Sequence, residues 1–243
     1  RVSYAGGYRA PQAFDEDMHI AIVGGKRVRI RLADDLREER SHSVSLSADL
    51  YHTFGKVQTN LLVEGFYTIL DDVFALRDMD DAADGGKVKE RYNGSGATVR
   101  GFNVEGRAAF TRWFELQAGV TLQQSRYKEP EFWSEDAEVP PVRRMFRTPD
   151  AYGYFTASFK PVRNFTADLS GTCTGSMLVQ HMAGSGVAQD VAVSTPSFFD
   201  MNIRLSYDVR IYKEITMQLY GGVQNLFNAY QKDFDKGVDR DSG

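Results

Sequence analysis

The chain has 243 residues, of which 42% are hydrophobic and 26% charged, and its formal net charge is −4. This balance leaves no basic stripe, so nucleic acid is not an expected partner. The single cysteine, Cys173, excludes an intrachain disulfide and a cysteine metal site, and no apolar run approaches the ~20 residues of a membrane helix.

The first predicted strand covers residues 1–8, because apolar or small residues recur at every second position. It ends at Pro11, since proline cannot donate a backbone hydrogen bond to a neighbouring strand. Residues 12–39 show no sustained period, so we expect a long loop there with room for one small hairpin. No secretory signal precedes the strand-like start at Arg1, which predicts a fragment or a processed chain.

Four further strands are expected in the middle of the chain. The first pair, at 43–50 and 57–74, alternates aliphatic with polar residues and is followed by an acidic loop at 77–92. The second pair, at 99–111 and 114–125, turns at the Arg-Trp dipeptide between the two strands and leads into a proline-rich loop.

The last part of the chain holds the most regular alternation. A hairpin is predicted with strands at 152–160 and 165–179. A long loop over 181–196 separates it from a second hairpin at 199–223, whose faces are apolar on one side and charged or amide-bearing on the other.

The connections between these strands alternate in length. Short ones are expected near residues 52–56, 112–113, 161–164 and 208–213, and long ones near 77–93, 129–149 and 181–196. A barrel that crosses the outer membrane has short turns on the periplasmic side and long loops outside. Most strands also reach the ~9–11 residues that a tilted membrane strand needs. We therefore predict an all-β fold, an antiparallel transmembrane β-barrel fragment.

Aromatic residues gather at the short turns. They are Tyr51, Phe54, Phe110, Trp113, Phe114, Phe159, Phe165, Tyr207 and Tyr212. Aromatic rings at one level of many strands form a girdle at the membrane interface. At any single turn, the alternative is a cross-strand pair that stabilises an ordinary hairpin. The repetition along the chain favours the girdle.

Three motifs resemble those of TonB-dependent outer-membrane receptors. Residues 8–11, Tyr-Arg-Ala-Pro after a strand, are similar to the FRAP box of that family. Residues 35–41 resemble the end of the box N-P-x-L-x-x-E-x-S, although Ala33-Asp34 stands where the family has Asn-Pro. Residues 222–230 resemble its penultimate-strand signature N-L-F-[DN]-x-x-Y, and the tail at 230–241 is similar to versions found in Bacteroidetes receptors.

The resemblance implies a fold and a role. Receptors of this family have a barrel of about 22 strands, an N-terminal plug and a TonB box that takes energy from the inner membrane. On this alignment, residues 1–243 provide about nine strands from the C-terminal portion of the barrel, and the plug, the early strands and the last strand are expected to be absent. The implied location is the outer membrane of a Gram-negative bacterium.

The expected function is TonB-dependent uptake of a scarce nutrient, above all an iron chelate (siderophore or haem) or cobalamin. The implied partners are the TonB complex, reached through the absent N-terminal region, outer-membrane lipid, and a small-molecule metal chelate or other nutrient. Two alternatives stay open. A passive outer-membrane porin shares the strand pattern without the three motifs, and a soluble β-sandwich binding domain shares the alternation without the sorted connections.

Ligand binding is expected in the long loops and at the strand ends. Tyr8 and Arg9, in the first motif, are candidate ligand-binding residues. His19 lies between the first two motifs, where haem receptors of the family carry an axial histidine, and imidazole suits haem iron. His181 and Met182, in a later loop, are further candidates. A solvated or packed loop side chain is the alternative for each histidine.

Two charged clusters suggest weaker hypotheses. Arg143, Arg144 and Arg147 could meet a lipopolysaccharide phosphate or an anionic siderophore, or could simply belong to a loop that returns to the sheet. An acidic cluster could hold Ca²⁺, but its spacing lacks the ordered pattern of a calcium loop, and a solvated charge run is the alternative. Its members are Asp71, Asp72, Asp78, Asp80, Asp81 and Asp84. No resident metal or cofactor is expected.

Catalysis is not expected either. His42 stands between Ser41 and Ser43, but adjacent residues of a strand point to opposite faces. His52 lies by a short turn, on the presumed periplasmic side. No phosphate-binding loop or zinc-type histidine motif occurs in the sequence.

Overall fold

The computed structural model describes residues 1–11, 28–79, 87–134, 136, 138–181, 183 and 187–230. Within these residues every regular element is a β-strand, as the alternation predicts. No helix in this part of the chain has the length and apolar character needed to cross a membrane.

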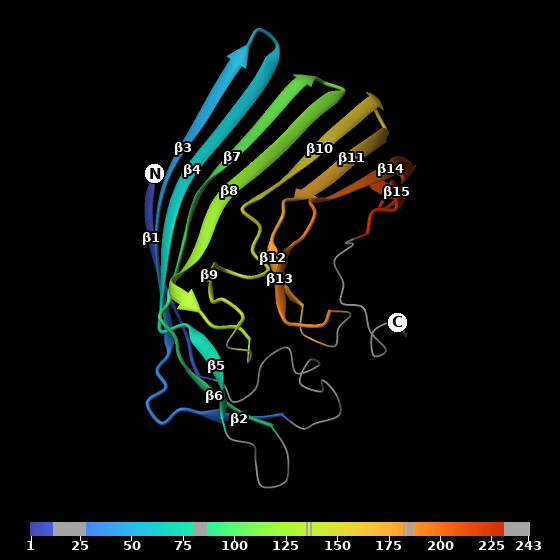
Figure 1. Cartoon of the computed structure of the whole chain (residues 1–243). Coiled ribbons are helices and arrows are strands. Elements are labelled where there is room, and N and C mark those ends of the chain that lie inside the picture. Colours follow the sequence, from blue (N-terminus) through green and yellow to red (C-terminus); the bar gives the residue numbers. More distant parts are fainter. Residues whose placement is uncertain are drawn as a thin grey trace.

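Ten strands form one sheet. Figure 1 shows that this sheet is curved. Nine of them follow one another across the sheet: β1 (Val2–Arg9), β3 (Glu39–Phe54), β4 (Val57–Asp71), β7 (Ala97–Thr111), β8 (Phe114–Glu131), β10 (Ala151–Val162), β11 (Phe165–Thr174), β14 (Phe198–Tyr212) and β15 (Ile215–Val223). The tenth, β9 (Val142–Arg144), pairs with the end of β8. All these pairs are antiparallel, which confirms the predicted fold class.

The connections are sorted by length between the two ends of this sheet. Two-residue turns at 55–56, 112–113, 163–164 and 213–214 join successive hairpin strands. Because neighbouring strands are antiparallel, these turns lie at one end, the turn end, and the long connections lie at the other, the loop end; the turns β3–β4, β7–β8 and β10–β11 lie at the top of Figure 1. The sorting predicted from the sequence is confirmed.

The long connections carry strands of their own at the loop end. β2 (Val28–Leu32), β5 (Phe74–Met79) and β6 (Lys87–Asn93) form a three-stranded sheet, with β2 parallel to β6 and β5 antiparallel to it. β12 (Leu178–His181) pairs with β13 (Val191–Ser194). The acidic segment at 77–92, expected to be a loop, therefore contains the end of β5 and most of β6.

The long strand predicted over residues 165–179 is divided in the structure. β11 ends at Thr174, where its pairing with Phe198 also ends, and the next strand, β12, belongs to a different sheet. At Gly175 the chain passes close to β10, because the Gly175 N–H donates a hydrogen bond of 2.7 Å to the Ala151 carbonyl oxygen. A Cβ on Gly175 would lie 2.6 Å from that oxygen, so the bend requires glycine.

The two faces of the main sheet differ in polarity. One face, called the outer face, carries apolar residues at matched positions, such as the row Leu46, Gly65, Phe102 and Leu122. Phe102 and Leu122 are 52% and 42% exposed, and among the described residues only three alanines are buried apolar side chains. No second sheet covers this face in the described part of the chain, as a β-sandwich would require. Such a surface fits lipid better than water.

Aromatic rings line the turn end of the outer face. Phe114 stacks on Phe110 and on Phe159, with ring centroids 5.3 and 4.7 Å apart, so the contact runs across β7, β8 and β10. The rings of these strands therefore lie at one level of the sheet, an arrangement that both the girdle and the cross-strand pair predict. Tyr51 departs from it, because it pairs in register with Asn60 and donates a hydrogen bond of 3.0 Å to Asp49 Oδ2, which places it on the polar inner face.

Candidate ligand-binding site

The connection before β3 and the connection between β4 and β7 are joined at the loop end. β2 comes from the first and pairs along its whole length with β6 from the second, from Val28↔Lys87 to Leu32↔Arg91. β5 completes this loop sheet on the other side of β6. Residues that are far apart in sequence therefore share one platform beside the ends of the main strands (Figure 1).

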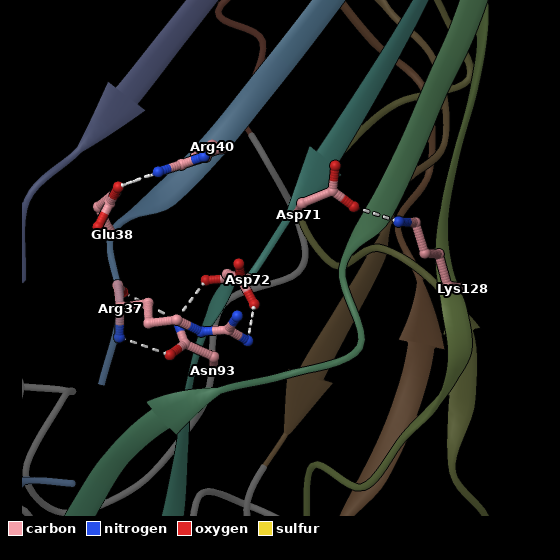
Figure 2. A network of polar contacts seen from close by, with 7 residues as sticks. All are labelled: Arg37, Glu38, Arg40, Asp71, Asp72, Asn93 and Lys128. Carbon is pink, nitrogen blue, oxygen red and sulfur yellow. Dashed lines mark hydrogen bonds and ion pairs between the residues drawn. The ribbon is translucent and has the colours of Figure 1, made fainter. Parts of the chain in front are cut away.

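A hydrogen-bond network, which we call the loop clamp, fastens this platform to the main sheet. It consists of Arg37, Asp72 and Asn93 (Figure 2). The Asn93 side chain accepts from the Arg37 backbone N–H (2.8 Å) and donates to the Arg37 and Asp72 carbonyl oxygens (2.9 and 2.7 Å). The Arg37 guanidinium donates to Asp72 Oδ1 at 2.7 Å, and Asp72 has a left-handed φ of 55°. Each loop thus fixes the path of the other.

The first two motifs meet beside the clamp. Arg9 and Glu39 are register partners on β1 and β3, and Arg9 Nη2 lies 3.0 Å from Glu39 Oε2. The same oxygen accepts from the Phe74 N–H at 3.2 Å, and the Arg9 guanidinium lies 4.8 Å from the centroid of the Phe74 ring. Tyr8 is 80% exposed and pairs with Arg40, on the other face of β1. The structure does not bring these two candidate residues together.

The connection β8–β10 and the connection β11–β14 form a second coupled pair. Ser134 Oγ donates to Asp190 Oδ2 at 2.6 Å, and the Arg147 N–H donates to the Leu178 carbonyl oxygen at 2.8 Å. Arg144 donates to the Ser176 carbonyl oxygen at 2.9 Å and lies 3.1 Å from Asp150 Oδ2. Arg144, considered from sequence as an anion-binding residue, is therefore engaged in holding these loops.

Of the candidate histidine and methionine ligands, His181 alone lies among the described residues. His181 ends β12, opposite Val191, and is only 9% exposed. His19 and Met182 lie outside the described residues. Within the described ranges, no group of three or more His, Cys, Asp or Glu side chains could hold a metal ion.

The acidic cluster is divided among different contacts. Asp72 belongs to the loop clamp, and Asp71 forms an ion pair with Lys128 (Figure 2). Asp78 lies in β5, while the remaining three members, Asp80, Asp81 and Asp84, lie outside the described residues. Asp71 and Asp72 therefore belong to ion pairs with Lys128 and Arg37.

Several titratable groups at the loop end have shifted pKa values, among them Tyr92 and Glu38. Burial, and secondarily the negative charge of Glu131, raises the pKa of Tyr92 above its ordinary value of 10.0, and the nearby Arg77 opposes this shift. The Arg77 guanidinium lies 4.9 Å from the Tyr92 ring centroid. The hydrogen bond from Arg40 lowers the pKa of Glu38 below 4.5.

His42 lies on the outer face, and its Nδ1 is 2.7 Å from the Tyr4 hydroxyl. Ser43 lies on the inner face, with its Oγ 2.9 Å from Thr68 Oγ1. The opposite directions expected for adjacent strand residues are confirmed.

The inner face carries a ladder of polar side chains, which hydrogen-bond to one another across neighbouring strands. Asn103 donates to Glu64 Oε1 at 3.1 Å and accepts from Thr121 at 2.8 Å. Tyr154 donates to Glu105 Oε2 at 2.6 Å. Sequence alternation predicted a polar face but did not single out these residues, because no motif marks them. Together they form a hydrogen-bonded polar surface across β4, β7, β8 and β10.

A hollow of about 990 Å³ lies on the inner face of β11, β14 and β15. Its lining includes Asp168, Asn202, Arg204 and Tyr220, and the Arg204 guanidinium lies 4.7 Å from the Tyr220 ring centroid. This lining offers donors and acceptors to a polar solute. It lay outside the sequence prediction, which looked for ligand contacts in the loops.

The third motif builds a turn at the end of β15. Asn225 has a left-handed φ of 50°, and its side chain accepts from the Ala229 N–H (2.7 Å) and donates to the Ala229 carbonyl oxygen (3.0 Å). Its own N–H donates to Asn202 Oδ1 at 2.9 Å, which ties the turn to β14. The motif therefore has a structural task.

The family model described as "TonB dependent receptor-like, beta-barrel" matches residues 1–226. A search of curated proteins finds no match.

Several solved structures share the fold. The siderophore receptor PirA from Pseudomonas aeruginosa is 13% identical, with a TM-score of 0.64 over 96% of this chain and 37% of that one. The FrpB iron transporter from Neisseria meningitidis is 14% identical, with a TM-score of 0.58 over 98% and 35%. The ferric-catecholate import receptor Fiu from Escherichia coli K12 is 14% identical, with a TM-score of 0.57 over 93% and 28%. The chain spans about a third of the length of these proteins.

Proposed function

Because the chain belongs to the family of TonB-dependent receptor β-barrels, we propose that it forms part of an outer-membrane receptor that takes up an iron chelate with energy supplied through TonB. The family match over residues 1–226 carries this proposal. PirA is a siderophore receptor, FrpB an iron transporter and Fiu a ferric-catecholate import receptor, which supports iron as the cargo.

The extent of the match supports a proposal about the architecture. We propose that residues 1–243 are the C-terminal portion of a larger barrel, because residues 222–230 resemble the penultimate-strand signature of the family and the solved receptors are about three times as long. The exposed apolar outer face fits the outer membrane of a Gram-negative bacterium. The TonB complex would act through a region that precedes this chain.

The mechanism proposed for the chain is capture outside followed by passage along the inner face. The coupled loops hold their polar groups on rigid supports, which lowers the entropic cost of binding. Once a plug moves, the polar ladder around Asn103 and the hollow beside Arg204 would offer hydrogen bonds to a hydrophilic chelate. Arg9 supports the first loop, whereas Tyr8, His19, His181 and Met182 remain proposed ligand contacts.

Haem is the second candidate cargo, because His19 lies between the first two motifs. The test is a titration of the full-length protein in detergent with haemin, cobalamin and ferric siderophores. His19→Ala is measured beside His52→Ala, a control at the turn end. A Soret shift that His19→Ala alone abolishes would establish haem binding. If the unmodified protein and both variants bind a ferric siderophore tightly, haem is excluded as the cargo and the receptor function is retained.

Energy coupling separates the receptor from a passive porin. Uptake of a labelled ferric siderophore is compared in cells with and without TonB. We expect uptake to require TonB, and equal uptake in both strains would favour the porin. A protein that stays monomeric and folded without detergent would instead support the soluble alternative.

A further inference from the structure

Among the cationic side chains on the outer face near the loop end are Arg40, Arg100, Arg126 and Lys128. Strand register places them on this face, since Arg40 is level with Asp71, Arg100 pairs with Tyr67 and Gln124, and Arg126 pairs with Thr98 on one side and with Arg144 on the other. Two of the four have carboxylate partners, because Arg40 contacts Glu38 and Lys128 contacts Asp71.

Arg100 and Arg126 differ from the other two. Among the described residues, neither has a carboxylate within ion-pair distance, and Arg100 Nη2 donates only to the neutral Gln124 Oε1, at 2.8 Å. Both are exposed. Because Arg100 faces Gln124 and Arg126 faces Thr98, the two arginines are diagonal neighbours on β7 and β8, roughly 7–8 Å apart at their backbones.

The pair stands at the edge of the apolar band. The next outward-facing pair toward the turn end is Phe102 with Leu122, followed by Val104 with Val120. Phe102 and Leu122 are both exposed, so the surface changes from cationic to apolar within one step along each strand. A molecule with an anionic head and acyl chains would match both halves of this surface.

We propose that Arg100 and Arg126 bind a phosphate of the phosphorylated glycolipid in the outer leaflet, with its acyl chains against Phe102 and Leu122. Guanidinium groups recognise phosphate through paired, charge-assisted hydrogen bonds. Gln124 and Thr98, on the same face, can bond the sugar hydroxyls that distinguish a glycolipid from a phospholipid. The assignment rests on the membrane orientation proposed above, but not on the identity of the imported ligand.

The test uses the full-length receptor in detergent, stripped of bound lipid. Binding of bisphosphorylated lipid A, dephosphorylated lipid A and phosphatidylglycerol is measured by native mass spectrometry and by fluorescence titration. The double variant Arg100→Gln/Arg126→Gln is compared with Arg112→Gln. Arg112 is an exposed arginine in the β7–β8 turn, at the opposite end of the same strands.

We expect the double variant to weaken binding of bisphosphorylated lipid A by about tenfold or more, and Arg112→Gln to leave it unchanged. Dephosphorylated lipid A and phosphatidylglycerol should both bind weakly. The proposal would be overturned if Arg112→Gln lost as much affinity for bisphosphorylated lipid A as the double variant. It would also be overturned if dephosphorylated lipid A or phosphatidylglycerol bound as tightly as bisphosphorylated lipid A. Chelate binding and heat-modifiable gel mobility of the same variants report separately on the receptor function and on folding.

Discussion

Arg9 shows how a side chain that marks a sequence motif can be engaged by the fold. Its guanidinium pairs with Glu39 of the second motif and covers the Phe74 ring, so it joins two strands and the start of the loop sheet. Asn225 does the same for the third motif, through its two bonds to Ala229. Arg9 and Asn225 therefore each have a structural role in the fold.

The loop clamp predicts a local effect of Asn93→Ala. The substitution removes three hydrogen bonds and leaves their backbone partners unpaired, at a cost of about 1–3 kcal/mol. Amide hydrogen exchange should accelerate about tenfold or more in both β2 and β6. Ser95→Ala, in the same connection, is the control. Unchanged exchange in β2 would show that the clamp does not couple the two loops.

Tyr92 predicts a pH dependence. Since burial raises its pKa in the folded state, the neutral phenol stabilises the loop sheet fully below pH 10.0, and this contribution is lost as pH rises through the folded pKa. Absorbance titration near the tyrosinate band, compared with Tyr92→Phe, should show one phenol that ionises above 10.0. If the difference curve has an ordinary midpoint, the phenol is not buried in solution.

At the scale of elements, β7 and β8 show what holds neighbouring strands at close range. Gly101 on β7 lies against the backbone of its partner strand, since a Cβ there would lie 2.8 Å from Gln123 Cα and closer still to the Leu122 carbonyl oxygen. A Cβ on Gly65 in β4 would meet no atom within 4 Å. Gly101 is therefore required by the close approach of its neighbouring strand, whereas Gly65 is not.

This contrast gives a matched pair of substitutions. Gly101→Ala should lower the free energy of unfolding by about 1–3 kcal/mol, because the strands must separate to admit the methyl group. Gly65→Ala should be neutral or slightly stabilising. Urea titration of the full-length protein refolded into vesicles measures both. Similar midpoints for the two variants would mean that the β7–β8 spacing adapts freely.

Most main-sheet strands could be predicted from sequence because one face meets an apolar environment and the other a polar one. The loop sheet could not, since β5 and β6 are rich in charge and their pairing with β2 is long-range. Alternation also led to one wrong strand, at residues 165–179, because it shows which face a side chain lies on but not which strand its backbone pairs with. Of the candidate site, the location at the loop end was predictable, whereas the Arg37–Asp72–Asn93 contacts were not.

At the scale of the whole molecule, the sheet separates two environments. Val120 and Thr121 are neighbours on β8, yet Val120 joins the exposed apolar rows while Thr121 donates to Asn103 on the inner face. The same alternation recurs on the neighbouring strands, β7 and β10. A single layer of strands therefore acts as the boundary.

Charge insertion tests this boundary. Val120→Arg should reduce the stability of the folded protein in vesicles by about 2–4 kcal/mol, the cost of a cation on the lipid face near the midplane. Thr121→Arg should cost less, about 1 kcal/mol, since it faces the polar interior and loses one hydrogen bond. Equal costs for the two substitutions would contradict the assignment of the faces.

The pairing of β2 with β6 also limits how such a protein can diversify. Two connections that are separated along the chain contribute strands to one loop sheet, so an insertion within β2 or β6 would shift the register of the other strand. A substitution that reshapes β2 should then be matched by compensating substitutions in β6. When loops are exchanged between relatives, residues 10–38 and 72–96 should accordingly be transferred together, so that β2 and β6 keep their own partners.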